Sequence, residues 1–255
     1  MLEALKIRIK QGKQYIPDVT ANPPRAPFRG LPYIEESKCN GCGACAEVCP
    51  TGALTLGPVR IDLGKCVFCG DCVRDCSRSA IAFTNFHKLG ATSREALTVG
   101  SCVTPEKYLE YAIACRREIV KIFGRSLKLR SVSAGGCNGC ELELNACSNV
   151  NFDMGRFGIE TVASPRHADG VVITGAVTAN MAYALEDTYR AIPSPKLVIL
   201  MGSCAISGGV FADSSELDRS FLGKYPVDLY LPGCPVHPLT FINGVLGLLG
   251  RRQKS

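Results

Sequence analysis

Eight cysteines between Cys39 and Cys76 form two copies of one spacing pattern. In each copy, two residues separate the first three cysteines and three residues precede the fourth. Thiolates with the shorter spacing wrap one corner of a 4Fe-4S cube, whereas the fourth, set one residue further along, reaches the neighbouring cube. The sequence therefore predicts two clusters that exchange one ligand. The first is expected on Cys39, Cys42, Cys45 and Cys76, and the second on Cys66, Cys69, Cys72 and Cys49.

A pair of zinc knuckles is the alternative for this block. Zinc sites usually combine two separated ligand pairs, and a doubled four-cysteine pattern is typical of clusters instead. Pro50 follows the fourth cysteine of the first copy, and Ser77 stands in its place in the second. This departure leaves the number of ligands unchanged.

Four further cysteines lie far apart in the second half of the chain: Cys137, Cys140, Cys204 and Cys234. They stand in the segments GGCNGCE, GSC and PGCP, each of which contains a turn-forming glycine. Four thiolates brought together from these loops would hold a third 4Fe-4S cluster. On ligand count alone, zinc remains an alternative at this site.

The second half of the chain alternates apolar runs with helical stretches. Continuous Val, Ile and Leu runs bounded by glycine are typical of buried parallel strands. Strands are expected at Leu127–Ser133, Gly158–Ala163, Gly170–Thr174, Lys196–Met201 and Val227–Leu231, and helices at Ala179–Ala191 and Pro238–Leu249. This order predicts a doubly wound α/β domain, whose ligands bind beyond the carboxyl ends of the strands. The four separate cysteines follow the first, fourth and fifth of these strands, so they should meet at that edge.

The chain divides into four predicted parts: an amphipathic arm (1–32), the first cysteine block (33–86), a helical linker (87–126) and the α/β domain (127–255). In the linker we expect one long helix that starts at Thr104 and Pro105 and ends at Gly124. In the arm, apolar residues lie on one side and basic residues elsewhere: Leu2, Leu5 and Ile9 against Lys6, Arg8, Lys10 and Lys13. Such a helix lies on a membrane or a membrane subunit, or packs on its own domain.

Composition excludes several classes of protein. A disulfide-stapled secreted protein would need a signal peptide and an even cysteine count, whereas this chain has 15 cysteines and a start, MLEALKIRIKQGK, without a continuous apolar core. The formal net charge of +6 invites a nucleic-acid interpretation. We discount nucleic acid as a partner because there is no Trp and no long Lys/Arg run. Each cluster with four thiolates carries about −2, so three clusters would offset this charge.

Two stretches resemble known families. Residues 33–84 resemble the two-cluster 4Fe-4S ferredoxin fold, and Phe28–Gly30 ahead of them resembles the ferredoxin-type subunits of complex I and formate hydrogenlyase. The motifs GGCNGCE, SPRHAD (Ser164–Asp169), TGAVT (Thr174–Thr178), GSC and PGCP resemble the small subunit of group 4 membrane-bound nickel–iron hydrogenases, over residues 103–250. That family is related to the cluster-N2 subunit of complex I. The spaced pair Cys137 and Cys140, with His167, is the hydrogenase form.

The resemblance implies an α+β two-cluster ferredoxin domain fused to an α/β flavodoxin-like domain. It implies an electron-transfer subunit with three 4Fe-4S clusters and no catalytic residue of its own. Electrons would pass between a donor module or soluble ferredoxin and the nickel–iron site of a partner large subunit. Antiporter-like membrane subunits would complete the complex, which places the chain on the cytoplasmic face of the inner membrane. The alternatives are the same electron-transfer subunit in a nickel-free quinone or sulfur reductase, a free-standing ferredoxin-type carrier, and a zinc-stabilised structural protein.

A few other residues invite a role. Glu141, Arg166 and His167 are expected near the third cluster, where they could tune it, although ordinary structural roles compete. The three remaining cysteines cannot supply a nickel site and are expected to be small buried hydrophobes: Cys102, Cys115 and Cys147. His87 and His237 are expected at the surface.

Overall fold

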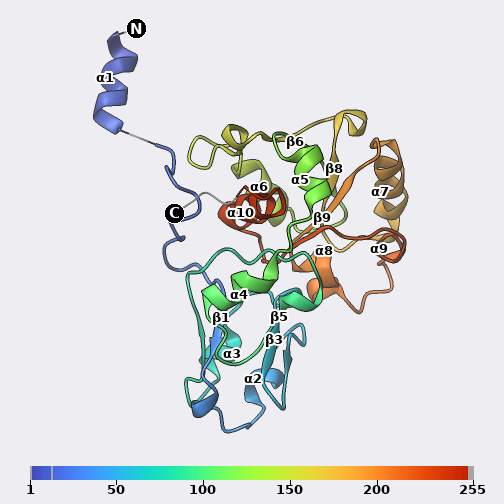
Figure 1. Ribbon diagram of the computed structural model, residues 1–255. Coiled ribbons are helices and arrows are strands. Elements are labelled where there is room, and N and C mark those ends of the chain that lie inside the picture. Colours follow the sequence, from blue (N-terminus) through green and yellow to red (C-terminus); the bar gives the residue numbers. More distant parts are fainter. Residues whose placement is uncertain (1, 13, 252–255) are drawn as a thin grey trace.

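The computed structural model describes residues 2–12 and 14–251. Its upper half in Figure 1 is built on a five-stranded, fully parallel sheet with the order β10-β9-β8-β6-β7. The strands are β6 (Leu127–Ser133), β7 (Ile159–Thr161), β8 (Gly170–Thr174), β9 (Leu197–Met201) and β10 (Leu229–Leu231). Counted along the chain this order is 2-1-3-4-5, that of the flavodoxin-like fold. The predicted doubly wound α/β domain is confirmed.

Both faces of this sheet are covered, which explains the continuous apolar runs. All five residues of β8 and of β9 are buried. One face packs against α5, α6 and α10, and the other against α7 and α9. The bounds are α5 (Arg117–Phe123), α6 (Gly139–Ala146), α7 (Ala179–Ala191), α8 (Ser203–Ser207), α9 (Ser220–Lys224) and α10 (Pro238–Leu248). Single 3-10 turns lie at Met154–Phe157, Pro165–His167 and Gly209–Phe211.

The lower half in Figure 1 carries the first cysteine block on short elements. β1 (Pro32–Ile34) pairs antiparallel with β4 (Ile81–Phe83), which joins the two ends of the block. A three-stranded sheet runs in the order β2-β3-β5, with β2 (Leu54–Thr55), β3 (Arg60–Asp62) and β5 (Thr98–Val99). Two four-residue helices, α2 (Ala44–Glu47) and α3 (Asp71–Arg74), follow equivalent cysteines of the two copies. Further 3-10 turns lie at Glu36–Lys38 and Glu95–Leu97.

The prediction of a single long helix in the linker is wrong. The structure has α4 (Pro105–Ala112) and then α5, with extended backbone at Ile113 and Arg116 between them. Tertiary contacts favour the break: Ala114 N donates to Thr92 Oγ1 at 2.9 Å, and Arg116 forms an ion pair with Asp228. The expected ends are correct, because Thr104 caps α4 and Gly124 ends α5.

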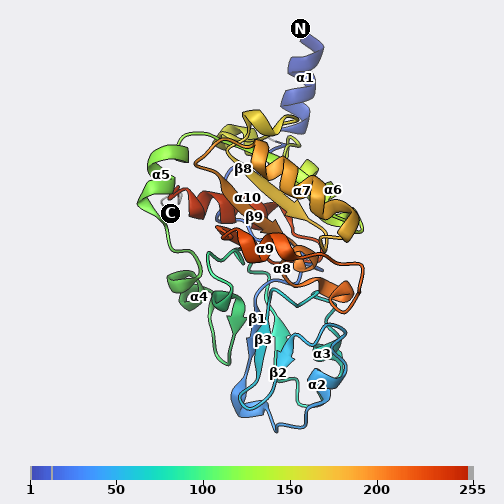
Figure 2. The same cartoon turned by 90° about the vertical axis from the view of Figure 1, so that its right-hand side faces the viewer.

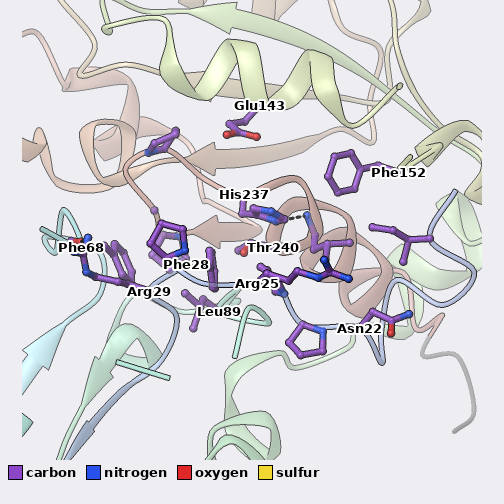
Figure 3. A pocket seen from close by; sticks show the side chains of 18 of the residues that line it. Asn22, Arg25, Phe28, Arg29, Phe68, Leu89, Glu143, Phe152, His237 and Thr240 are labelled. Atoms are coloured by element: carbon purple, nitrogen blue, oxygen red, sulfur yellow. Dashed lines mark hydrogen bonds between the residues drawn. The ribbon is translucent and has the colours of Figure 1, made fainter. Parts of the chain in front are cut away.

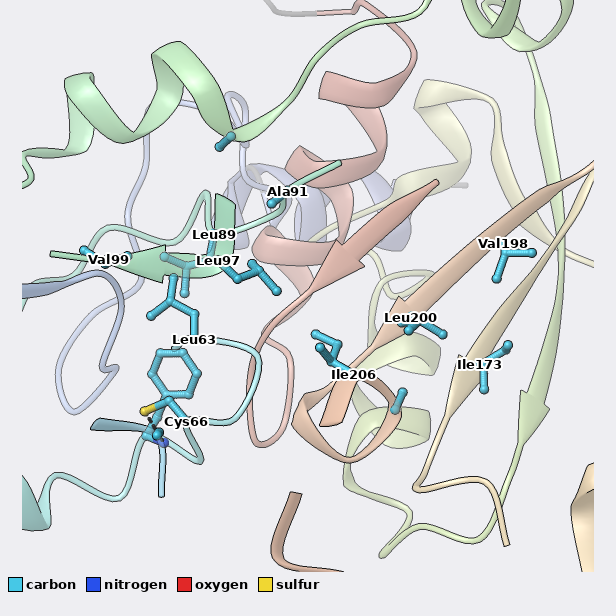
Figure 4. Close-up of a cluster of buried hydrophobic side chains, with 14 of the residues drawn as sticks. Leu63, Cys66, Leu89, Ala91, Leu97, Val99, Ile173, Val198, Leu200 and Ile206 are labelled. Atoms are coloured by element: carbon cyan, nitrogen blue, oxygen red, sulfur yellow. Dashed lines mark hydrogen bonds between the residues drawn. The ribbon is translucent and has the colours of Figure 1, made fainter. Parts of the chain in front are cut away.

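One hydrophobic core joins the two halves of the molecule. It contains Leu63 and Leu97 from the cysteine block together with Ile173, Leu200 and Ile206 from the α/β half, as Figure 4 shows. Ala91 of the linker also forms an antiparallel bridge with Tyr230 of the edge strand β10. Because close-packed interiors resist sliding, the cysteine block is held rigidly against the α/β half.

The N-terminal arm starts with a helix that projects away from the body, α1 (Leu2–Gln11), in both Figure 1 and Figure 2. None of the residues of α1 is buried, so this helix does not pack on its own domain. The arm is anchored further along, where Ile16 N donates to Asn151 O at 2.9 Å and Val19 is fully buried. Lys13, expected on the basic side of this helix, lies outside the described residues. Within residues 2–12 and 14–251, no helix is long and apolar enough to cross a membrane.

Candidate iron–sulfur cluster sites

The exchanged ligand sets expected from the sequence each line one small cavity. Cys39, Cys42, Cys45 and Cys76 line the first, with Leu56 and Ile81 among its apolar walls. The second cavity is lined by Cys49, Cys66, Cys69 and Cys72, with Leu54, Ile61 and Phe83. The fourth cysteine of each copy therefore lies with the first three cysteines of the other copy. The fold of the block brings these residues together.

Backbone N–H groups point at the sulfurs in the same way in both copies. Ala53 N lies 3.3 Å from Cys49 Sγ, and Ala80 N lies 3.3 Å from Cys76 Sγ. Burial acts to raise the pKa of the Cys76 thiol, but the N–H groups of Ala80 and its neighbours outweigh burial, and the pKa is lowered. Donors of this kind stabilise a thiolate and tune a cluster that it binds.

The third set of cysteines gathers at the carboxyl edge of the parallel sheet. Cys137 and Cys140 follow β6 and open α6, Cys204 lies on α8 just after β9, and Cys234 follows β10. The polypeptide approaches closely here: a Cβ on Gly202, whose φ is +100°, would lie 2.6 Å from Cys140 Sγ. The loop from β6 to α6 starts at the carboxyl end of β6, next to β8. The strand order reverses between β6 and β8, and flavodoxin-like sheets bind ligands at this switch point.

The donor chemistry of the three sites, four cysteine thiols in each, suits 4Fe-4S clusters. A zinc ion draws four sulfurs to about 2.3 Å from one point, whereas a cube binds each thiolate at its own corner. Burial also raises the pKa of Cys66 and of Cys140 to about 12. Buried thiols of this kind become thiolates when a metal centre compensates their charge.

The Cys49/Cys66/Cys69/Cys72 set has each of the other two sets as a neighbour. The pKa of Cys72 is raised, mainly by burial and then by neighbouring thiols. Cys45, which lines the other cavity, is one of these neighbours. Burial also raises the pKa of Cys234, and the next contributions come from Cys137 and from Cys69. Thiols must lie near one another to interact in this way. The Cys49/Cys66/Cys69/Cys72 set therefore lies between the other two sets.

Comparison with known proteins agrees with this geometry. Residues 137–248 match the family model of the NADH ubiquinone oxidoreductase 20 kDa subunit, and residues 32–55 match a 4Fe-4S binding domain. A probable membrane-bound hydrogenase subunit, mbhJ of Pyrococcus furiosus, is 38% identical over 148 residues, which are 58% of this chain and 87% of that protein. The chain belongs to the NADH ubiquinone oxidoreductase 20 kDa subunit family. It combines the family's 20 kDa subunit with a 4Fe-4S binding domain, so the fusion expected from the sequence is confirmed.

Two other relatives show the breadth of the 20 kDa subunit family. Formate hydrogenlyase subunit 7 of Escherichia coli is 40% identical over 146 residues, covering 57% of this chain and 57% of that protein. An NADH-quinone oxidoreductase subunit of Heliobacterium modesticaldum is 41% identical over 138 residues, covering 53% of this chain and 78% of that protein. The chain is thus a subunit of the oxidoreductase type, with 4Fe-4S binding in its N-terminal part.

In this 20 kDa subunit family member, Glu141 lies at the third set of cysteines. Its Oε1 accepts hydrogen bonds from Ser133 Oγ at 2.6 Å and from Thr174 Oγ1 at 2.7 Å, at the ends of β6 and β8. The Glu141 carboxylate is also one of the neighbours that raise the pKa of Cys140 and Cys204, after burial. Its place at the site is therefore fixed by two strands.

Arg166 and His167 are placed differently from Glu141. Both are exposed in the 3-10 turn that leads into the start of β8. The cysteines follow the carboxyl ends of the strands, and parallel strands have their two ends at opposite edges of a sheet. The expected hydrogen bonds from Arg166 and His167 to a cluster stay a prediction that this placement does not favour.

Several other expectations need correction. His87 is buried, with 3% of its surface exposed, because the arm and α10 cover it. His237 is partly buried, and its Nδ1 accepts from Leu239 N at 3.1 Å to cap α10. Cys147 is buried as expected, but Cys102 and Cys115 are exposed.

Three polar residues that hold the site together were missed by reasoning from the sequence. Arg219 donates to four carbonyl oxygens, those of Ala176, Cys204, Ala205 and Ile206, at 2.8–3.2 Å. Ser203 Oγ donates to Cys66 O at 2.6 Å. Arg29 Nη1 donates to Phe68 O at 3.2 Å, beside the second cavity. Each residue reaches across the fold to a distant segment, so only the glycine-flanked GSC motif around Ser203 and the FRG motif around Arg29 could have drawn attention to them.

A larger cavity of about 840 Å³ opens beside Cys234, between the arm, the Phe68 loop and α10 (Figure 3). Phe28 and Phe152 pack edge-on against the His237 ring, with centroids 5.3 and 5.8 Å away. Arg25, Arg29 and Glu143 supply its charged walls. The anchored arm of the chain thus forms one side of the surroundings of Cys234.

Proposed function

We propose that this chain is an electron-transfer subunit with three 4Fe-4S clusters, in a row that ends at a partner's nickel–iron site. The distal cluster would be held by Cys39, Cys42, Cys45 and Cys76, the middle one by Cys49, Cys66, Cys69 and Cys72, and the proximal one by Cys137, Cys140, Cys204 and Cys234. The two cavities lined by the exchanged cysteine sets carry this proposal. The N-terminal half would then have the two-cluster ferredoxin fold.

The clusters would supply one-electron transfer, and this chain supplies their ligands, their spacing and their electrostatic surroundings. The core shared by both halves supports this role because it holds the cysteine sets at fixed separations. Separate ferredoxin and small subunits would have to dock before electrons could move between them. In the fused chain this step is absent, since covalent linkage and a common core join the sites.

An apolar surface near the proximal cysteines supports a fixed partner. Cys137 and Cys234 are exposed. Leu142, two residues after Cys140, is 62% exposed, and Val210 and Phe211 are exposed beyond Gly209, which packs on Cys204. Apolar side chains that gather on an exposed surface are typical of interaction sites. We infer that a large subunit covers this edge and brings the nickel–iron site to the proximal cluster.

The relatives' names include a membrane-bound hydrogenase and formate hydrogenlyase. By this relation, antiporter-like membrane subunits and a donor module or soluble ferredoxin would complete the complex on the cytoplasmic face of the inner membrane. The projecting helix α1 is exposed along its whole length and carries Lys6, Arg8 and Lys10. It would suit contact with a membrane subunit or anionic lipid.

A nickel-free complex is the second candidate, favoured by the match to the NADH ubiquinone oxidoreductase 20 kDa subunit. In that case the same electron-transfer subunit would pass electrons toward a quinone or a sulfur compound. A free-standing carrier is less well supported, because such a protein would not leave apolar residues exposed around the proximal site.

Metal analysis of the anaerobically purified chain, alone and with its co-purifying partners, tests the proposal. We expect about twelve iron and twelve sulfide per chain, with nickel only when a large subunit is present. Twelve iron without nickel in the intact complex would instead support the quinone or sulfur reductase. About eight iron with one zinc would remove the proximal cluster and with it the wire.

A further inference from the structure

The junction between the middle and the proximal cysteine sets is bridged by one buried serine. Ser203 is 1% exposed and begins α8, directly before the ligand Cys204. Its hydroxyl donates to the carbonyl oxygen of Cys66, 137 residues away in sequence, at 2.6 Å. Cys66 belongs to the middle set. The hydroxyl therefore connects a ligand of one set to the neighbour of a ligand of another.

The backbone of Ser203 makes a second connection within the proximal set. Ser203 N donates to Gly233 O at 3.0 Å, and Gly233 directly precedes the ligand Cys234. Ser203 Oγ also lies 3.2 Å from Gly233 O, but Cys66 O, at 2.6 Å, is the nearer acceptor for its single proton. Two of the three proximal ligand loops and one middle ligand loop thus meet at a single residue. A water molecule would have to replace the hydroxyl if it were absent, because the Cys66 carbonyl lies in a buried position.

Packing around this bridge allows little adjustment. A Cβ on Gly64 would lie 2.7 Å from Ile206 Cγ2, so the chain leading to Cys66 runs directly against α8. Cys66 and Ile206 both belong to the core that joins the two halves, which Figure 4 shows around them. The separation between the two ligand sets is therefore set where α8 and the Leu63–Cys66 segment touch.

We propose that Ser203 is the positioning residue that couples the middle cluster to the proximal cluster. It would do so by a hydrogen-bonded route from the Cys66 peptide to the Cys204 peptide. The step that it serves moves one electron, so that one cluster is oxidised and the other reduced, while no bond forms or breaks and no proton moves. This inference rests on the proposed function, since it requires both clusters.

The test uses the anaerobic full-length chain with its clusters and compares two serines of the same short helix. Ser203→Ala removes the bridge. Ser207→Ala is the matched control: Ser207 Oγ donates to Ser203 O at 3.0 Å and accepts from Gly209 N at 3.2 Å, so this variant loosens α8 but leaves the link to Cys66 in place. Ser203→Thr keeps a hydroxyl and is the rescue variant. Iron per chain, the spin–spin interaction between the reduced clusters in EPR spectra, and freeze-quench rates of electron arrival at the proximal cluster are measured for each.

We expect Ser203→Ala to keep its iron but to show a weaker spin–spin interaction and a severalfold slower arrival of electrons. Ser207→Ala should match the unaltered chain, and Ser203→Thr, whose added methyl group must be accommodated in a buried position, should lie closer to the unaltered chain than Ser203→Ala does. Unchanged interaction and rate in an iron-replete Ser203→Ala chain would overturn the inference. So would selective loss of proximal iron in that variant, because Ser203 would then support only the ligand loops. If the unaltered chain itself lacks a third cluster, the proposed function fails, whatever Ser203 does.

Discussion

Arg94 and Asp62 form a two-pronged ion pair at the junction of the two halves, with Nη1–Oδ1 at 2.7 Å and Nη2–Oδ2 at 2.5 Å. Both side chains are partly buried. Asp62 Oδ1 also accepts from Gly64 N, and Asp62 O accepts from Cys66 N at 2.9 Å. The pair therefore braces the turn that leads into Cys66, which we propose as a ligand of the middle cluster.

Arg94→Ala should destabilise this turn, since it leaves a partly buried carboxylate without its partner. We expect a loss of about 1–3 kcal/mol in the free energy of unfolding, measured by anaerobic denaturant titration. The control is Arg190→Ala, which breaks an exposed pair with Glu186 on α7 and should cost about 0.5 kcal/mol or less. Equal effects of the two substitutions would contradict the bracing role.

Arg219→Ala should release the proximal site. The guanidinium satisfies four carbonyl groups around α8, so its removal leaves them without donors and loosens the loop of Cys204. We expect a cost of at least about 2 kcal/mol and loss of about four iron per chain, with the two ferredoxin-type clusters retained.

Iron analysis and EPR of each cluster type check the Arg219 prediction. Arg117→Ala, at an exposed position on α5, is the control and should keep all its iron. Parallel loss of iron from all three sets in Arg219→Ala would show general unfolding and contradict a local role.

Glu141→Gln should raise the reduction potential of the proximal cluster. The substitution removes a negative charge beside Cys140 and Cys204, which favours the more negative, reduced form. The amide oxygen of Gln still accepts from Ser133 and Thr174, so the loop should stay in place. An EPR-monitored redox titration gives the potential.

Glu143→Gln is the matched control for Glu141. It lies on the same helix but faces the cavity of Figure 3, and its charge contributes, after burial, to the raised pKa of Cys147 instead. We expect a smaller shift of the proximal potential in Glu143→Gln. An equal shift in both variants would mean that the Glu141 carboxylate has no special place at the site.

His87 should make the fold less stable in acid. Its pKa is lowered to about 4, from an ordinary 6.5: burial is the largest cause, the charges of Lys88 and His237 act in the same direction, and the Val19 backbone opposes them. Asn243 Nδ2 lies 3.3 Å from His87 Nε2, and Nδ1 is buried without a hydrogen-bond partner among the described residues. As pH falls below about 6.5, the unfolded chain binds a proton at His87 while the folded chain does not. Stability is therefore lost between these two pKa values.

From about pH 7 to pH 5 this histidine should cost about 2 kcal/mol of unfolding free energy. His87→Gln should remove that slope, which denaturant titrations at both pH values measure. Exchange of the histidine C2 proton, followed by mass spectrometry, reports the pKa of His87 in the loaded chain directly. The same pH slope in His87→Gln and in the unaltered chain would refute the prediction.

The sequence by itself determined the features that depend on local spacing. The grouping of the fourth cysteine of each copy with the first three of the other follows from their x2-x2-x3 spacing, and the two cavities of the structure have this grouping. The buried strands β8 and β9 follow from apolar runs bounded by glycine or turns. Thr104 and Gly124 marked the ends of helices because caps act within one turn.

Only the tertiary structure decided what depends on contacts between distant residues. The linker helix breaks because Thr92 and Asp228 offer partners to Ala114 and Arg116, and local propensity cannot register such partners. His87 is buried because the arm and α10 close over it. The middle and proximal cysteine sets lie next to each other because α8 packs on the segment before Cys66. A buried hydroxyl and a shared core hold these segments together, although they are far apart in the sequence.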